Sequence, residues 1–505
     1  MSPFVRTLVL TIAAIGFLFD TYELLMFPVI GSDAVGELLF KTEFTRLTVD
    51  QQNAVRAWAG RMLWIAALCG GVFGLLGGWL IDRLGRKTVM AASILIYSFS
   101  PVCAAFSTEL WMLILFRCTT FIGVCVEMVA AVTWLAELFT DKRTREMAIG
   151  WTLATASLGG ILVTLTYNLI VENAGSLPAL PVGDGSGQHA PWRYTLLTGL
   201  IPGALILLLL PFVPESRAWL EKKQAGTLRR PRFAELFAPD LRRATIVTAI
   251  LSACGYAAAF GALQLTPLQI APGTADLVAQ QKEVTATQEK LKATPAGTTE
   301  HSALQAELQQ KQKDAAAAVK ARRGDIQLWQ ELGGLSGRIL LAVLLTIVPS
   351  RILLRLFLIP GVVLLPLTYA NLVSAPYVVF ATAIFFCGLL TVAQFSYLSE
   401  FLPKVFPLHL RGTGGSFATN VGGRMIGTMA ATLNTELLAP MFSGPNPMKV
   451  AMAAAVIGGT VYLIALVTSF WLPDPRMDET SQGLPAAGPV STADEGIRGL
   501  NNDRP

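Results

Sequence analysis

Long apolar runs separated by short polar loops dominate the sequence. Several of these runs reach the roughly 20 residues that a helix needs to cross the hydrocarbon core of a bilayer. We predict twelve membrane-spanning helices, at residues 5–30, 58–81, 88–107, 110–139, 147–171, 192–213, 243–270, 329–350, 352–374, 376–402, 413–440 and 448–472. The pattern therefore predicts an all-α membrane protein.

Lysine and arginine are concentrated in alternate loops. The basic loops are 82–87, 140–146 and 214–242. Almost no basic residue falls in the short loops at 107–109, 172–191 and 441–447. By the positive-inside rule, the basic loops lie in the cytoplasm. An even number of spans then places both termini in the cytoplasm, in a multi-pass inner or plasma membrane protein.

The polar loop at 214–242 divides the predicted spans into two groups of six. The two groups contain similar stretches, since Ala59 to Leu63 at the start of span 2 resembles Ser336 to Leu340 early in span 8. Weak internal symmetry of this kind is typical of secondary transporters. The predicted parts are an N-terminal six-helix bundle (1–213), a cytoplasmic linker (214–242), a C-terminal six-helix bundle (243–475) and a disordered cytoplasmic tail (476–505).

One extracytoplasmic loop of the second half, residues 272–328, is much longer than the others. Leu277, Val284 and Leu291 recur in it every seven residues. This spacing predicts an amphipathic helical hairpin on the outer face of the protein. The insert is either a solvated spacer or an arm that acts as a lid or binds a partner.

Composition narrows the class of function. Of the 505 residues, 53% are hydrophobic and 14% are charged, whereas soluble domains are about one quarter charged. The sequence has no GxxxxGK[ST] loop for ATP-driven pumping and no spacing of its six cysteines that is typical of a metal site. We therefore expect no enzyme, no cofactor, no metal and no nucleic-acid partner, and a monomer in the lipid bilayer.

The loop between predicted spans 2 and 3 carries the most specific motif. Its marked positions are Gly78, Asp82, Arg83, Gly85, Arg86 and Lys87. They match G-x-x-x-D-R-x-G-R-K, so the loop resembles the corresponding loop of the major facilitator superfamily. Glycine permits a tight turn, and an aspartate can cap the start of a helix.

Other stretches resemble the same superfamily. Arg117 to Gly123 is similar to its span-4 element, and the stretches at 137–143 and 213–220 resemble span ends of the sugar porter and organic-ion branches. Gly16 to Glu23 and Asn420 to Gly427 resemble spans 1 and 11 of aromatic-acid and other metabolite:proton symporters. Span 7 lacks the Gln-Gln pair of the sugar porters.

The resemblance implies twelve helices in two pseudo-symmetric six-helix bundles that rock around a central site. The function that the resemblance implies is proton-coupled symport of a small organic anion, such as an aromatic acid or a monocarboxylate, by alternating access. The alternatives are a sugar or polyol:proton symporter, a proton-driven efflux antiporter, and a transporter-like receptor.

Ionisable residues inside the predicted spans are the candidates for proton coupling. Each costs at least ~2.5 kcal/mol in hydrocarbon, so such residues are functional hypotheses. Asp20 and Glu23 share one helix face, and Arg117 lies at a similar depth at a rise of about 1.5 Å per residue. We expect Asp20, with Glu23, to meet Arg117 and to carry proton coupling. The alternative is a static ion pair.

Arg424 is the main candidate for substrate binding. It lies near the membrane midplane in span 11, and Asn420 shares its helix face. Because a guanidinium binds a carboxylate through two hydrogen bonds, Arg424 favours an anionic substrate. Pairing of Arg424 with Glu127 is the alternative. The other candidate substrate-binding residues are Tyr22, Gln264 and Gln394.

Charged residues at helix ends predict a cytoplasmic gate. The resemblance implies that Glu137 with Arg143, and Glu400 with Arg411, join the loop between spans 2 and 3. The predicted gate residues are Gly78, Asp82, Arg83, Gly85, Arg86, Lys87, Glu137, Arg143, Glu400 and Arg411. Exposed ion pairs are weak singly, so the gate depends on the whole network.

Overall fold

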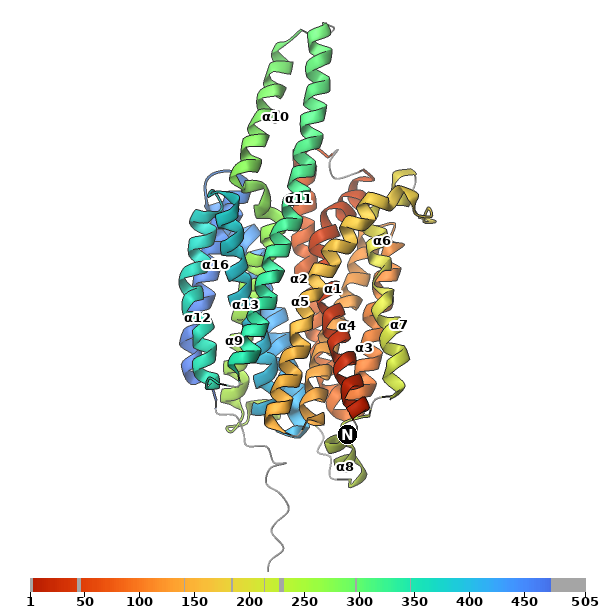
Figure 1. The fold of residues 1–505 in the computed structure, drawn as a ribbon, viewed down its shortest axis with the longest axis vertical. Helices are drawn as coiled ribbons and strands as arrows, with labels where there is room; N and C mark the ends of the chain where they lie inside the picture. The colour runs from red at the N-terminus through yellow and green to blue at the C-terminus, as the bar shows by residue number, and fades with distance from the viewer. Residues whose placement is uncertain are drawn as a thin grey trace, which may run out of the picture.

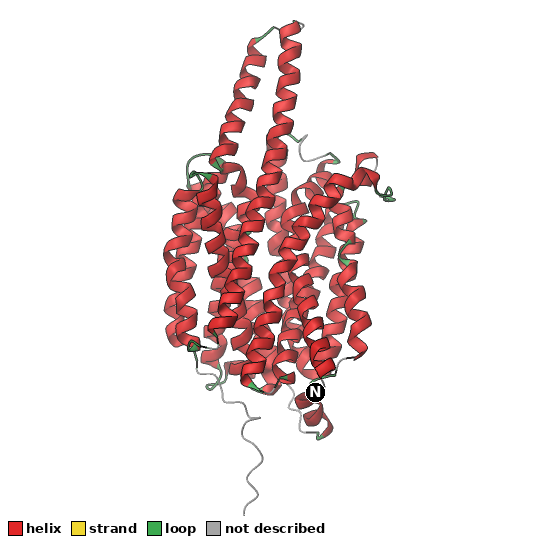
Figure 2. Cartoon of the chain, viewed as in Figure 1, coloured by secondary structure: helices red, strands yellow, loops and turns green. Residues whose placement is uncertain are grey.

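The computed structural model describes residues 3–42, 47–139, 141–182, 185–212, 214–226, 231–295, 298–345 and 347–473. These residues form helices joined by short loops, with no strand among them (Figure 2). The expected all-α class is therefore confirmed. The predicted tail at 476–505 lies outside the described residues.

The first bundle contains seven helices that run from red to yellow in Figure 1. They are α1 (Pro3–Phe40), α2 (Val49–Leu84), α3 (Arg86–Ala105), α4 (Leu110–Leu138), α5 (Lys142–Asn173), α6 (Pro191–Leu197) and α7 (Leu200–Leu209). α4 packs against α1, α2 and α3, and α1 packs along α5. α6 and α7 together occupy the sixth predicted span, which is interrupted next to Gly199.

The short helix α8 (Arg217–Gln224) lies in the linker, and the second bundle follows it. The bundle's elements are α9 (Arg242–Ala258) with the π-helical η6 (Ala259–Leu263) and η7 (Thr266–Ile270), α10 (Ala275–Ala293), α11 (Thr299–Leu344), α12 (Ser350–Leu367), α13 (Tyr377–Val405), α14 (Arg411–Ser416), η11 (Phe417–Gly427), α15 (Met429–Thr432), η12 (Leu433–Leu438) and α16 (Asn446–Thr468). The eleventh predicted span thus contains two π-helical stretches, η11 and η12, a rare conformation that is frequent at functional sites.

Nine helices in the described part of the chain are long and apolar enough to cross a membrane. The other three predicted spans are helical as well. One is the interrupted pair α6 and α7, another is the part of α11 that follows its polar hairpin segment, and the third runs from α14 to η12. Together these twelve helical segments form the two bundles expected from the sequence.

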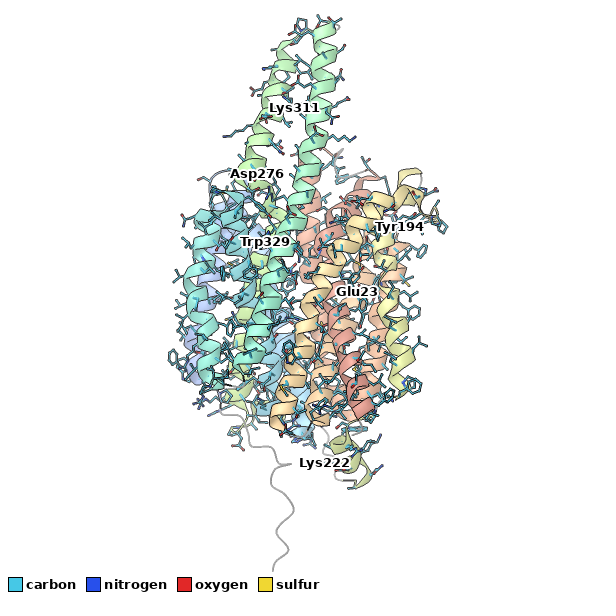
Figure 3. All side chains as sticks on the ribbon, viewed as in Figure 1. Glu23, Tyr194, Lys222, Asp276, Lys311 and Trp329 are labelled. Atoms are coloured by element: carbon cyan, nitrogen blue, oxygen red, sulfur yellow. The ribbon has the colours of Figure 1, made fainter. Side chains whose placement is uncertain are left out.

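α10 and the first part of α11 project from one end of the bundles as a hairpin (Figure 1). Leu277, Val284 and Leu308 are buried in it. Lys311 donates to Thr287 Oγ1 at 3.1 Å across the hairpin, on the part that projects furthest in Figure 3. We call this the hairpin end of the protein. The opposite end, which carries α8 and the N-terminus, is the linker end (Figure 1).

α11 is a single helix of 46 residues that extends from the hairpin into the second bundle. At a rise of about 1.5 Å per residue, it is about 70 Å long. Asp276 at the base of the hairpin forms an ion pair with Arg322 of α11. The hairpin is therefore tied to a helix that reaches the centre of the molecule.

The two bundles meet along two seams. In the first, which we call the α5/α11 seam, α5 packs against α11. In the second, the α2/η11 seam, α2 packs against α14 and η11. Near the hairpin end, apolar side chains of both bundles form one cluster that includes Phe27, Val55, Leu268 and Tyr369. The bundles are therefore joined by apolar packing as well as by the polar contacts described below.

Two adjacent glycines of α5 allow helices of both bundles to approach it closely. A Cβ atom on Gly159 would clash with the backbone carbonyl of Leu18 in α1. A Cβ atom on Gly160 would lie 2.6 Å from Cδ of Glu331 in α11. Small residues are the usual means of close helix approach in membranes. This pair therefore places α1 and α11 at the same level on two sides of α5.

We expect Gly159→Ala to destabilise the protein. Overpacking at a close backbone contact costs about 1–3 kcal/mol, so the melting temperature of the purified protein in detergent should fall by several degrees. Gly175→Ala is the matched control, because no atom lies within 4 Å of the position of its Cβ. Equal melting temperatures for the two variants would contradict the close packing of α1 on α5.

Candidate functional site

Asp20 of α1, Glu127 of α4 and Arg424 of η11 lie together between the bundles, and we call them the central cluster. All three are buried, with exposed fractions of 8%, 1% and 3%. Asp20 and Glu127 both lie within electrostatic range of Arg424. The carboxylate of Glu127 points at Gly16 of α1, where a side chain would collide with it. The cluster therefore combines residues from both bundles.

The guanidinium of Arg424 is held by neutral groups. Nη1 donates to Asn420 Oδ1 at 2.7 Å, and Nη2 lies 3.5 Å from Met128 Sδ. Nε has no hydrogen-bond partner. Among the described residues, Arg424 forms no ion pair within hydrogen-bond distance of a carboxylate, although Glu127, its alternative partner, lies within electrostatic range. Asn420 is fixed in turn, because its Nδ2 donates to Ser416 Oγ at 2.8 Å.

Aromatic side chains of the second bundle stand beside Arg424. The Tyr256 ring lies 5.8 Å from Arg424 Cζ. It stacks on Phe260 and meets Phe395 edge-on, at centroid distances of 6.0 Å and 4.8 Å. Our sequence reasoning missed these three residues, because nothing in the pattern distinguishes them from core aromatic residues. The arrangement places a buried cation next to an aromatic wall.

Arg117 binds the backbone of α1 rather than its carboxylates. Nη1 donates to the carbonyl of Glu23 at 2.9 Å, and Nη2 donates to the carbonyl of Leu24 at 3.0 Å. Pro28 explains this contact, because it lacks the N–H that would otherwise bind the carbonyl of residue 24. The predicted pairing of Asp20 with Arg117 is therefore not found, whereas Glu23 does lie within electrostatic range of Arg117. The electrostatic partners of Asp20 are Arg424 and Arg338.

Glu23 and Tyr22 point into the first bundle. Figure 3 labels Glu23 midway along this bundle, where a Cβ atom on Gly199 would collide with its carboxylate. Both Glu23 oxygens are buried without a hydrogen-bond partner. The hydroxyl of Tyr22 lies 2.5 Å from Thr198 Oγ1. Of the predicted proton-coupling residues, Asp20 is thus the one whose electrostatic partners lie in the other bundle.

The predicted glutamines lie in the second bundle. Gln264 is buried between η6 and η7, and its Oε1 has no hydrogen-bond partner. Gln394 precedes Phe395 of the aromatic wall, and its Nε2 donates to the carbonyl of Leu390 at 3.3 Å. Both side chains are buried amides with hydrogen-bonding capacity near the centre of the protein.

Two further buried charges lie on α11, and our sequence reasoning gave neither of them a role at the centre. Glu331 is 6% exposed and accepts a hydrogen bond from Gln327 Nε2 at 3.1 Å. Arg338 donates through Nη1 to the carbonyl of Leu153 in α5, across the seam. The predicted span began at residue 329, which put Glu331 at the membrane edge. Because α11 ends at Leu344, Glu331 lies about 20 Å from that end at 1.5 Å per residue.

Asp82 joins the bundles at the linker end. Its carboxylate accepts hydrogen bonds from the backbone N–H groups of Gly412 and Thr413, at 3.2 Å and 2.8 Å. It also accepts one from Thr413 Oγ1 at 2.8 Å. Gly78 lets the helices approach, since a side chain there would clash with Ser416. A carboxylate of α2 thus binds the first turn of α14.

Arg86 connects this contact to α4. Its Nη2 lies 2.9 Å from Glu137 Oε1 and 3.3 Å from Asp82 Oδ1. The same nitrogen donates to the carbonyl of Leu408 in the second bundle at 3.4 Å. Arg86 and both carboxylates are buried, so these contacts are shielded from water, unlike an exposed ion pair.

The segment after α7 completes the network. Glu215 Oε1 accepts from the N–H of Arg86 at 3.1 Å, and its Oε2 accepts from the N–H of Lys87 at 3.0 Å. Ser216 donates its hydroxyl to Glu137 Oε2. Gly85 has a φ of 108°, a left-handed conformation that favours glycine. It turns the chain between α2 and α3 so that these N–H groups face Glu215.

The remaining predicted gate residues lie outside this network or on its edge. Arg83 is exposed and lies over the Trp79 ring at 4.9 Å. Glu400 forms an ion pair with Lys404, one helical turn further along α13. Arg411 lines a cleft between the bundles. The side chain of Arg143 lies outside the described part of the structure.

This cleft lies between α4, α13, α14 and η11 and has a volume of about 20 Å³. Polar groups of Thr133, Ser399, Arg411 and Thr419 contribute to its lining. Met128 lines it too, and the Met128 Sδ atom contacts Arg424. The cleft therefore reaches the methionine that contacts the guanidinium of Arg424.

Comparison with known families matches residues 27–240 to the family described as "Sugar (and other) transporter". The chain is 30% identical over 156 residues to the arabinose-proton symporter of Bacillus subtilis (strain 168), which is 31% of this chain and 32% of that protein. It is 34% identical over 167 residues to the 4-hydroxybenzoate transporter PcaK of Pseudomonas aeruginosa, which is 32% of this chain and 33% of that protein. The chain thus matches about one third of the length of these relatives.

Solved structures resemble the whole chain. The proton:xylose symporter XylE has a TM-score of 0.63 and 16% identity, covering 93% of this chain and 96% of that chain. The human organic anion transporter MFSD10 has a TM-score of 0.59 and 14% identity, covering 94% of this chain and all of that chain. The expected resemblance to the major facilitator superfamily is confirmed. The matched family and these relatives are transporters, which agrees with the expectation that the chain is not an enzyme.

We expect Asp82→Asn to open the linker end. The change removes the negative charge that holds Gly412 and Thr413, and hydrogen bonds to charged groups contribute about 1.5–3 kcal/mol. A cysteine placed at Thr419 in the cleft should then react severalfold faster with a thiol reagent. The control is Arg83→Gln, because the Arg83 side chain is exposed on Trp79. Equal labelling rates in the two backgrounds would refute the gate.

Proposed function

We propose that this chain, which has the fold of the major facilitator superfamily, is a secondary active transporter that carries a small organic anion together with protons. The substrate binds at Arg424, between the two bundles, and Asp20 carries the coupled proton. The bundles expose this site to each side of the membrane in turn.

The contacts of the buried Arg424 side chain are the main support for this proposal. A buried ion without an opposite charge is strongly destabilising, and a well-placed partner offsets that cost. Within the described chain, the hydrogen-bond partners of Arg424 are an amide and a thioether, and its Nε has none. Asp20 and Glu127 lie within electrostatic range of Arg424, but neither accepts a hydrogen bond from it. A substrate carboxylate would form a direct ion pair and accept two parallel hydrogen bonds from the guanidinium. This favours an anion over a neutral substrate.

The aromatic wall supports an acid with an aromatic or apolar body. Offset and edge-on contacts between aromatic rings add about 0.5–1.5 kcal/mol to the burial of their area. Tyr256, Phe260 and Phe395 already adopt these arrangements. A carboxylate on Arg424 would place the rest of the substrate beside these rings. The site therefore suits an aromatic acid better than a short monocarboxylate.

Competition for Arg424 explains how proton and anion are coupled. Asp20 Oδ1 is buried without a hydrogen-bond partner, and Arg424 is its first electrostatic partner. A bound anion neutralises Arg424 and deprives Asp20 of this stabilisation. Binding a proton then removes the cost of keeping the Asp20 charge buried. Anion and proton therefore bind together, which is the requirement for symport.

Alternating access requires the polar contacts at the linker end to break. The basic loops place this end in the cytoplasm, so both termini are cytoplasmic and the hairpin is extracytoplasmic. Asp82, Arg86 and Glu137 then hold the cytoplasmic side closed through Gly412, Thr413 and Leu408. Opening inward separates α2 from α14, and the cleft beside Arg411 provides the path to Arg424. The transport unit is the monomer.

A sugar or polyol is the second candidate substrate. The description of the matched family supports it, and the buried amides of Gln264 and Gln394 suit hydroxyl groups. In that case Arg424 would have a structural role in the second bundle. Its missing carboxylate partner favours the anion.

Uptake into proteoliposomes under a pH gradient tests the proposal. We would screen aromatic acids, short monocarboxylates and sugars with the wild-type protein, Arg424→Ala and Asp20→Asn. An aromatic acid should accumulate with the wild type. Arg424→Ala should reduce acid uptake by 10- to 100-fold, as the loss of about 1.5–3 kcal/mol predicts. Asp20→Asn should abolish accumulation but retain exchange of acid across the membrane.

Arg243→Ala is the matched arginine control, because Arg243 donates to the carbonyl of Trp471 at the surface. It should transport as the wild type does. If sugars accumulate and Arg424→Ala transports them normally, the anion site is wrong and Arg424 is structural.

A further inference from the structure

We propose that Glu331 is a proton switch of the α5/α11 seam, which binds a proton when the seam closes and releases it to water when the seam opens. This inference rests on the proposed transport function, but it concerns a different residue in the other bundle.

Glu331 lies on the surface where one bundle moves against the other. Its side chain packs on Gly160 of α5, where an added Cβ would lie 2.7 Å from Glu331 Oε2. The neighbouring Gly159 holds α1 at the level of Leu18. Leu18 of α1 and Glu331 of α11 therefore contact α5 at similar depths, one from each bundle. A movement that separates α5 from α11 would expose Glu331 to water.

In the closed seam the Glu331 carboxylate has little compensation for its burial. Gln327 provides one neutral hydrogen bond at 3.1 Å. Glu331 forms no ion pair with any side chain in the described part of the protein. Arg338 lies within electrostatic range of Glu331 but forms no ion pair with it, and burial disfavours the ionised form of a carboxylate. Closing the seam therefore favours a bound proton on Glu331.

Arg338 links Glu331 to the central cluster. It has two carboxylates within electrostatic range, Glu331 on its own helix and Asp20 on the first bundle. In the closed seam its Nη1 donates to the carbonyl of Leu153. When α5 and α11 separate, Arg338 loses both Leu153 and Asp20, whereas Glu331 moves with it. Water and Arg338 then stabilise the ionised form of Glu331.

Apart from Arg338 and Asp20, the described groups that face this region are bound to other partners. On α5, the hydroxyl of Tyr167 donates to Asp33 at 2.9 Å. On α13, Cys387 donates to Thr368, and Tyr397 stacks on Phe401. Asp20 of α1 lies within range of Arg338, and Glu23 points at Gly199 instead. On α11 itself, Asp325, Arg322 and Arg323 lie nearer the hairpin, where Arg322 pairs with Asp276.

The proton transfer is a simple exchange between a Glu331 oxygen and water. When the seam closes, the carboxylate takes one proton from water on the open side. When the seam opens, the acid returns one proton to water on the side that opens. Each closing therefore requires one proton, and closing slows at alkaline pH even without net proton transport.

Substrate exchange in the Asp20→Asn background isolates this step, because the amide that replaces the Asp20 carboxylate cannot carry a proton. With equal pH on both sides, exchange by Asp20→Asn should fall at alkaline pH, approaching tenfold per pH unit, the limit for one required proton. The double variant Asp20→Asn/Glu331→Gln should exchange at a rate independent of pH. Glu331→Asp in the same background should retain the alkaline fall. If the double variant falls as Asp20→Asn does, Glu331 is not the switch.

A second measurement does not require transport. Infrared difference spectra of the purified protein between alkaline and acidic pH should contain a protonated carboxylic acid signal that Glu331→Gln removes. The signal should persist in Gln330→Ala, a control for the loss of a neighbouring side chain on α11. Identical spectra for wild type and Glu331→Gln overturn the proposal. If the wild-type protein transports no organic acid, the proposed function fails. The infrared spectra still decide whether Glu331 binds the proton.

Discussion

The cost of burying charge in a membrane governs the arrangement of this protein. Each buried ionisable group needs an opposite charge, a set of hydrogen bonds or a proton. Arg117 meets this requirement through backbone carbonyls of α1 that lie before Pro28. Asp82 meets it through the first turn of α14. Arg424 does not meet it fully, and the incomplete compensation of this cation is the basis of the proposed substrate site.

Close helix packing places these charges. Gly159 and Gly160 let α1 and α11 approach α5, and Gly78 lets α2 approach α14. The same contacts form the two seams along which the bundles must separate. Charges that lie on the seams therefore change their surroundings when the bundles move, whereas charges inside one bundle, such as Glu23, do not. This difference separates candidate coupling residues from structural ones.

The sequence predicted the helices and the linker-end motif well, because apolar length and glycine spacing are local properties. It also singled out Asp20 and Arg424 as charges inside apolar runs, and the structure buries both. The prediction that Asp20 pairs with Arg117 failed for two reasons. The depth of a residue along a helix does not show which face of the helix it lies on. In addition, Pro28 leaves a backbone carbonyl free to accept a hydrogen bond from Arg117. Glu331 was missed because its helix continues into the hairpin, so the apolar run alone did not show that this residue packs against α5.

Calorimetric binding to the purified protein tests the central claim most directly. We would titrate an aromatic acid and a sugar in buffers that differ in their heat of ionisation, which gives the number of protons bound with the ligand. The account predicts that the acid binds with proton uptake in the wild type, without uptake in Asp20→Asn, and not measurably in Arg424→Ala. Binding of the sugar with no binding of the acid would contradict it.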